Sequence, residues 1–220
     1  VIENFKRFHP KPEAVQCSDP QEEPEFIKPH FGLRLFPVWH VGTDYLHEIG
    51  KNWYQYLVDN GVEFVWETKV TEIDFDNQEL YCDWNTPKET IEYDRLIFGV
   101  GKSGIDFGKK LAEKYELATE PKSVQIGVRF EAPQKHFQKL IDISYDFKLY
   151  RKYDSKGVSL RSFCTNNNAA YVAAEHTYGD YSYNGHAKKD EAYRNDMTNF
   201  GILMEIKNID KPFDWSRDAV

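Results

Sequence analysis

Residues 93–104, with the sequence YDRLIFGVGKSG, constrain the fold of this chain more than any other stretch. Residues 96–98 form a short apolar run that ends abruptly in glycines, which predicts a buried strand followed by a tight turn. Residues 105–117 then show the apolar periodicity of a helix. A strand that enters a helix through glycines brings bare backbone amides close to a ligand, and the helix N-terminus favours an anion there.

The three glycines of this turn have the spacing G-x-G-x-x-G of dinucleotide-binding loops, although many such clusters are ordinary strand-to-helix turns. A P-loop is excluded, because that motif requires a glycine at the position occupied by Leu96. The first phosphate loop of a Rossmann domain would require an acidic residue about 20 positions later, after a further strand. Glu120 and Glu131 match this requirement only loosely, so the plain turn and the dinucleotide loop both remain open interpretations.

Charge and cysteine content exclude several classes of function. The formal net charge is −8 over 220 residues, which argues against partners that are bound through phosphate backbones or anionic lipids. No apolar run approaches the roughly 20 residues that a membrane span needs. Cys17, Cys82 and Cys164 are widely spaced and predict neither a disulfide framework nor a zinc site. We therefore predict a cytoplasmic protein with no nucleic-acid or membrane partner, and assign no oligomeric state.

Periodicity predicts a helix over residues 43–61, with Thr43 as N-cap, and then a strand over residues 62–67. A β-meander is expected over residues 69–75, 80–84 and 90–93. Beyond residue 120 the sequence predicts a short helix at 134–141 and strands at 123–131, 147–150, 158–164 and 171–175, with a last apolar segment at 203–206. We divide the chain into an extended lead-in over residues 1–37 and two domains, 38–120 and 121–220. The lead-in suggests a chain that is cut from a longer protein.

Isolated polar residues give weaker signals. Asp44 and His47 share a helix face and could bind a metal, but without a third ligand an offset of the helix dipole is favoured. Cys164 could pair with a downstream histidine such as His186, although a lone cysteine in an apolar strand is usually inert.

Arg129 lies in a predicted strand, where it alternates with Val128 and Phe130. If these two neighbours face a core, Arg129 should point to solvent, to an acidic partner, or to a ligand carboxylate or phosphate.

Several separated runs together resemble the uncharacterised FAD-dependent dehydrogenases, flavoproteins of the broad group with two dinucleotide-binding domains. These runs are HVGTDYL (40–46), NGVEF (60–64), TKV (68–70), residues 93–104, GVRFE (127–131), RSFC (161–164), NGH (184–186) and NF (199–200). The chain departs from such proteins in two places. Their N-terminal strand–GxGxxG–helix unit has no counterpart in residues 1–35. Their frequent Met-Cys-Pro-Gly-Gly run is replaced, after Cys164, by TNNNA.

The resemblance implies an α/β (mixed α+β) class. Residues 38–120 would be a partial FAD/NAD(P)-binding domain with a β-meander, and residues 121–220 a mixed, β-rich substrate-side domain. It implies a fragment of an FAD-dependent oxidoreductase that transfers a hydride to or from a small-molecule substrate, with NADH or NADPH as candidate reductant; the fragment alone is expected to be inactive. It implies that the 93–104 turn is a second stretch that faces the cofactor, and not the first phosphate loop.

The residues expected to contact the cofactor are Val70, Gly99, Gly101 and Ser103. Those expected on the flavin-ring and substrate side are Arg129, Cys164, Asn166, Asn184, His186 and Asn199. No residue is singled out as a catalytic base. The competing hypothesis is a non-catalytic α/β binding module without a cofactor.

Overall fold

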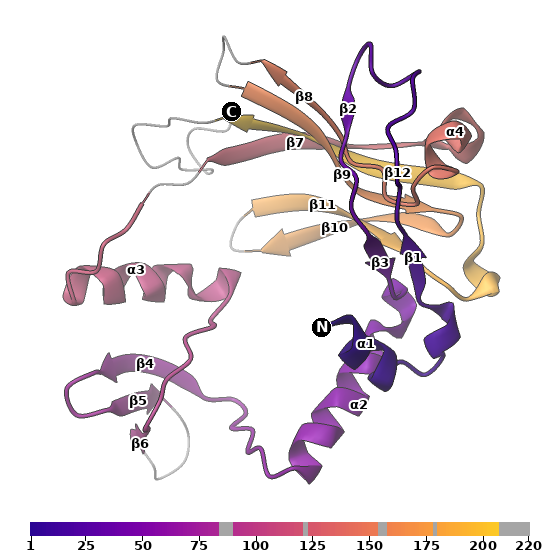
Figure 1. The fold of residues 1–220 in the computed structure, drawn as a ribbon. Coiled ribbons are helices and arrows are strands. Elements are labelled where there is room, and N and C mark those ends of the chain that lie inside the picture. Colours follow the sequence, from indigo (N-terminus) through magenta and orange to yellow (C-terminus); the bar gives the residue numbers. More distant parts are fainter. Residues whose placement is uncertain (84–89, 121–122, 154–157, 178–179, 207–220) are drawn as a thin grey trace. The chain divides into compact units, whose positions relative to one another are not determined.

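The computed structural model describes residues 1–83, 90–120, 123–153, 158–177 and 180–206 (Figure 1). The chain divides into two compact units. The larger unit combines Val1–Leu57 with Pro121–Val220, and the smaller unit is Val58–Glu120.

The larger unit is built on a five-stranded antiparallel sheet. Its strand order is β2 (Gly32–Leu33), β8 (Leu149–Tyr153), β9 (Val158–Asn167), β12 (Met197–Ile206) and β7 (Val124–Pro133). The hairpin of β10 (Ala170–Thr177) and β11 (Asp180–Ala187) lies beside this sheet and contacts β7, β9 and β12 (Figure 1). Strands β1 (Gln16–Ser18) and β3 (Val38–His40) form a separate pair.

The core of this unit is aromatic and includes Phe200, near the start of strand β12. Phe200 is buried with Phe147, Ile27 and Leu33, and its ring meets that of Phe137 edge to face at 5.2 Å. Phe137 lies between the 3-10 turn η4 (Gln134–His136) and the short helix α4 (Gln138–Ile141). These aromatic contacts stabilise the packing of Phe137 against the sheet, because edge-to-face pairs contribute free energy beyond that gained from burying apolar area.

The N-terminal part of the larger unit contains several helices. Helix α1 (Ile2–Phe8) leads to η1 (Pro12–Ala14), and η2 (Thr43–Tyr45) leads to α2 (Leu46–Asp59). Phe8 of α1 stacks on Trp53 of α2 at a ring distance of 5.5 Å. A further 3-10 turn, η6 (Glu191–Tyr193), precedes β12.

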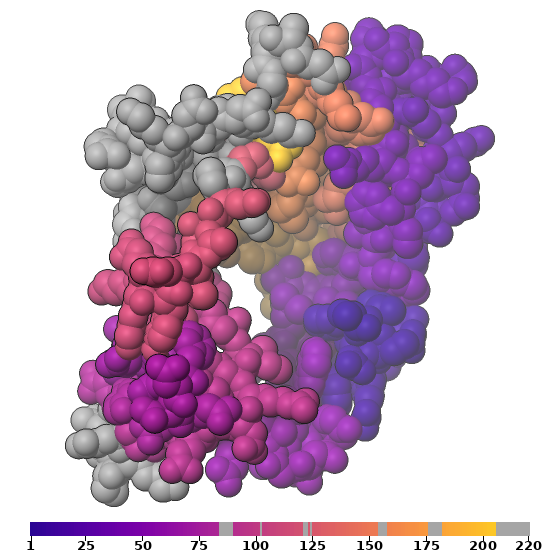
Figure 2. Space-filling view, turned by 60° about the vertical axis from the view of Figure 1, so that its left-hand side comes forward, coloured from indigo at the N-terminus to yellow at the C-terminus, as the bar shows by residue number. Residues whose placement is uncertain are grey.

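The smaller unit, in purple to rose in Figure 2, contains the meander β4 (Lys69–Asp74), β5 (Glu79–Asp83) and β6 (Thr90–Glu92). After η3 (Lys102–Gly104) comes helix α3 (Ile105–Lys114). The Tyr115 hydroxyl donates to the Ile73 carbonyl at 2.6 Å and so ties the end of this helix to β4.

The α/β class expected for the chain is wrong. Antiparallel strands dominate, and every strand pair within the described residues is antiparallel. Parallel strands require long crossovers, usually helical. Here the meander and the hairpin join consecutive strands by short connections, and β9 and β12 pair antiparallel although the β10–β11 hairpin lies between them in the chain. The fold is a β-rich mixed one, and not a doubly wound sheet.

Two expected strands, at residues 62–67 and 96–98, are also wrong, because both segments are irregular. Trp66 is 66% exposed and Ile97 is 94% exposed. A strand needs a neighbouring strand to pair with, and no strand of the described residues pairs with either of these apolar runs.

Other expectations are confirmed, with shifted bounds. The predicted first helix forms as η2 and α2, the meander forms as β4 to β6, and the predicted helix at 134–141 is split into η4 and α4. The lead-in is less extended than expected because it contains α1, and strand β11 was not foreseen.

Candidate functional site

Strands β7, β9, β10, β11 and β12 of the larger unit line a cavity of about 610 Å³. Much of the lining is apolar and includes Val128, Phe163, Val172 and Leu203. Gly127 and Gly201 leave the adjacent part of the sheet without side chains. A volume of this size lies within the range of small-molecule sites, which are typically apolar with a few placed polar groups.

Arg129 is the charged residue in this lining. Its Nε donates to the Tyr183 carbonyl at 3.1 Å, and its Nη1 donates to the Cys164 carbonyl at 3.1 Å and to Asn199 Oδ1 at 2.8 Å. Burial lowers the pKa of the Arg129 guanidinium, with the Cys164 side chain opposing this shift. The guanidinium nevertheless remains protonated at neutral pH.

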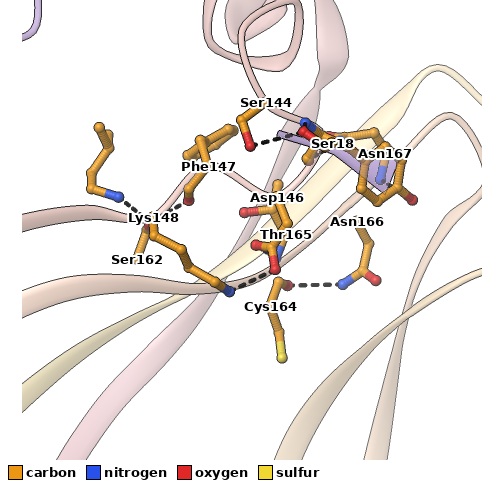
Figure 3. Close-up of polar contacts among 12 residues, drawn as sticks. Ser18, Ser144, Asp146, Phe147, Lys148, Ser162, Cys164, Thr165, Asn166 and Asn167 are labelled. Carbon is orange, nitrogen blue, oxygen red and sulfur yellow. Dashed lines mark hydrogen bonds and ion pairs between the residues drawn. The ribbon is translucent and has the colours of Figure 1, made fainter. Parts of the chain in front are cut away.

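A β-bulge supplies one of these acceptors. In the pairing of β9 with β12, Asn166 faces Asn199 and Phe163 faces Gly201, so Cys164 and Thr165 together oppose a single residue. Cys164 has φ +45°, a left-handed conformation that is unusual outside glycine. Its carbonyl accepts from Arg129 and, at 2.9 Å, from the Asn166 amide (Figure 3).

Two buried asparagines complete the network. Asn166 is 5% exposed and Asn199 is fully buried, and the Asn166 amide donates to Asn199 Oδ1 at 3.0 Å. Gly185 of β11 closes over them: a Cβ at this position would stand 2.1 Å from Asn166 Nδ2 and 2.2 Å from Arg129 Nη1. Only a residue without a side chain allows the hairpin to approach the sheet this closely.

A second layer of contacts supports the bulge from the other side. The Thr165 amide donates to Asp146 Oδ1 at 2.9 Å, and Asp146 forms an ion pair with Lys148 at 2.6 Å (Figure 3). Asn167 donates to the Tyr145 carbonyl at 2.6 Å. The bulge is therefore fixed by backbone and side-chain bonds on both of its faces.

The structure brings together four of the six residues predicted on the substrate side, namely Arg129, Cys164, Asn166 and Asn199. Asn184 lines the same cavity, and its amide donates to Glu175 Oε2 at 2.5 Å. His186 lies in β11 opposite Tyr171, outside these contacts. Sequence reasoning missed Gly185, although it stands inside the NGH run that carried the resemblance.

The expected orientation of the neighbours of Arg129 is only partly met. Val128 is 67% exposed and therefore does not face a core, whereas Phe130 contacts the Phe200 ring at 5.5 Å. Arg129 points to backbone carbonyls, an asparagine and the cavity, and not to an acidic partner within the described residues.

The four residues predicted to contact the cofactor lie in the smaller unit. Val70 pairs with Cys82 beside a register shift in the meander. Gly101 has φ +64°, and a Cβ on Gly99 or Gly101 would meet no atom within 4 Å, so the backbone of this turn is open. The Ser103 hydroxyl donates to the Val100 carbonyl at 3.4 Å.

A second, polar cavity of about 370 Å³ in the larger unit is lined in part by Tyr145 and Lys189. Burial lowers the pKa of Lys189 to about 8 and raises the pKa of Tyr145 to about 12. His40 contacts the Tyr145 ring at 5.1 Å. Burial lowers the pKa of His40 to about 4, reinforced by the charge of Lys189.

No group of three or more metal-binding side chains is assembled in the described ranges, so Asp44 and His47 have no metal-binding partners there. Asp44 instead accepts hydrogen bonds from the backbone amides of Lys189 and Asp190. In the part of the chain that the structure covers, no helix has the length and apolar character needed to cross a membrane. A comparison with models of known protein families and with curated proteins found no match to this chain.

Proposed function

We propose that this chain forms part of an FAD-dependent oxidoreductase, in which the Arg129 cavity receives a small-molecule substrate. The observation that carries the proposal is the position of Arg129 in the lining of that cavity, where the Cys164 carbonyl and Asn199, itself bonded to Asn166, hold its guanidinium. Arg129, Cys164 and Asn199 lie in runs that resemble flavin dehydrogenases, whereas Asn166 lies in the segment that departs from them. Arg129 and Asn199 are 70 positions apart in the sequence, and the pairing of β7 with β12 brings them together.

The residues proposed to contact FAD are compatible with such a cofactor. Gly99 and Gly101 have open space where a Cβ would stand, so a nucleotide could lie directly against the backbone. Val70 and Ser103 complete this set. When bound, the flavin would supply the hydride chemistry, with NADH or NADPH as the candidate reductant.

The protein would contribute binding and electrostatics. A guanidinium fixed by three hydrogen bonds cannot rotate freely, so it presents its remaining donors in one direction. The apolar walls of the cavity would exclude water from a bound substrate. A cytoplasmic location is also part of the proposal, and it is supported by Cys17, Cys82 and Cys164, which are all free thiols.

The test is to express the complete coding sequence and measure flavin after purification. We expect a yellow protein whose denaturation releases about one FAD per chain, and we expect NADH or NADPH to bleach the flavin absorbance under anaerobic conditions. A colourless protein that cannot be reconstituted with FAD would refute the flavoenzyme proposal and favour the cofactor-free binding module.

A further inference from the structure

We propose that the Arg129 cavity selects a ligand with an apolar body and a single carboxylate. This inference concerns the site in "Proposed function", but it rests on the cavity and does not require that the chemistry there involves flavin.

The guanidinium has five N–H donors, and three hydrogen bonds account for Nε and Nη1. Within the described residues, no hydrogen bond from Nη2 to an oxygen acceptor is found, although hydrogen bonding with the Cys164 side chain also raises the pKa of Arg129. The three acceptors are two backbone carbonyls and an amide oxygen, all of them neutral. The positive charge is therefore held in a half-buried position without a carboxylate partner in the described ranges.

An uncompensated buried charge is costly, because transfer from water removes its hydration. The carboxylate that raises the pKa of Arg129 is that of Asp146, and it is already paired with Lys148 at 2.6 Å. A ligand carboxylate in the cavity would supply the missing counter-charge and accept from Nη2. Such charge-assisted hydrogen bonds are about twice as strong as neutral ones.

The remaining lining determines the rest of the ligand. Val128, Phe163, Val172 and Leu203 provide apolar contacts around a volume of about 610 Å³. The side-chain polar groups besides Arg129 are those of Ser182, Tyr183 and Asn184, and the Asn184 amide is engaged by Glu175. A densely charged ligand such as a phosphate ester would find one cation only, whereas an aryl or alkyl carboxylate matches both the single charge and the apolar walls.

The experiment uses 3-phenylpropionate as probe and its neutral analogue 3-phenylpropionamide as comparator, with isothermal titration of the full-length protein. We expect the carboxylate to bind at least about tenfold more tightly than the amide, since a charged hydrogen bond is worth roughly 1.5–3 kcal/mol. Arg129→Gln should bring the ratio of the two affinities to about one. The matched control is Arg151→Gln, because Arg151 lies over the Tyr153 ring outside this cavity, and it should leave the ratio unchanged.

Arg129 also holds the bulge, so a second variant guards against misfolding. Val172→Trp leaves Arg129 intact and fills the cavity from β10; it should abolish binding of both probes while the thermal transition stays close to that of the wild type. The inference is overturned if wild-type protein binds neither probe, binds both equally, or binds phenyl phosphate more tightly than the carboxylate. Retained binding by Val172→Trp would overturn it as well. None of these readouts uses flavin, so a colourless protein that binds the carboxylate selectively would refute the flavoenzyme proposal alone.

Discussion

Replacing Gly185 with alanine tests the geometry of the site through protein stability. A Cβ at this position would lie 2.1 Å from Asn166 Nδ2, 2.2 Å from Arg129 Nη1 and 2.4 Å from Asn199 Oδ1. Both asparagines are buried, so they have little room to move. The hairpin must shift away from the sheet, or the three side chains must give up their shared hydrogen bonds.

The magnitude follows from these two costs. Overpacking of a well-packed interior typically costs 1–3 kcal/mol, and each lost hydrogen bond costs about 1 kcal/mol. We therefore expect Gly185→Ala to lower the free energy of unfolding by about 2–4 kcal/mol. Urea unfolding followed by circular dichroism measures this directly, provided that the slope of the transition is unchanged.

Gly50 provides a matched control. It lies inside α2, and a Cβ there would meet no atom within 4 Å. Gly50→Ala should raise the free energy of unfolding by about 0.5–1 kcal/mol, because alanine has the higher helix propensity. If Gly185→Ala proved as harmless as Gly50→Ala, the close approach of the hairpin to Arg129 would be wrong.

Three further predictions follow from the buried groups of the larger unit. Thr165→Val should change the free energy of unfolding by less than about 1 kcal/mol, because the buried Thr165 hydroxyl has no partner among the described residues. Thr198→Val should lower it by about 1–3 kcal/mol, since Thr198 Oγ1 donates to the Asn166 carbonyl at 2.9 Å. Equal effects of the two variants in urea unfolding would contradict this difference. Burial and Lys189 lower the pKa of His40 from 6.5 to about 4 against the opposing charges of Asp146 and Asp44, so the folded state disfavours the protonated ring. Stability should be complete above about pH 6.5 and fall by at most about 3 kcal/mol towards pH 4, and a His40→Gln variant with the same slope would argue against this origin. Burial lowers the pKa of Lys189 to about 8. Brief acetylation near about pH 8 should therefore modify Lys189 before Lys188, whose ammonium lies 3.4 Å from the centre of the Tyr193 ring. Mass spectrometry that found Lys188 modified first would contradict this prediction.

Part of the site could be predicted from the sequence because its residues lie in strongly patterned segments. The alternation around Arg129 predicted a strand, and Cys164 and Asn199 lie in runs that carry the resemblance, while Asn166 was predicted on the substrate side from a segment that departs from it. Their convergence could not be predicted, since it depends on which strands become neighbours in the sheet. The bulge at Cys164 was equally hidden, because the sequence gives no signal for the extra residue in β9.

The errors in the smaller unit have a different cause. Residues 62–67 and 96–98 have strand composition, but Trp66 and Ile97 are exposed and their segments lack strand partners in the described ranges. The residue pattern indicates which secondary structure a segment favours, whereas its contacts with neighbouring segments determine which structure forms. The absence of a side chain at Gly99 and Gly101 is known from the sequence, but the open space around them is not, since a Cβ on the nearby Gly104 would stand 2.3 Å from Val100.

Both proposals depend on the claim that the Arg129 cavity binds a ligand. The most direct measurement is a titration of ¹⁵N-labelled protein with 3-phenylpropionate, followed through its amide resonances. We predict chemical-shift changes that cluster at the amides of Gly127, Arg129, Phe163, Asn184 and Gly201, with the meander of the smaller unit unaffected. Shifts that are absent, or that gather away from these strands, would contradict the claim.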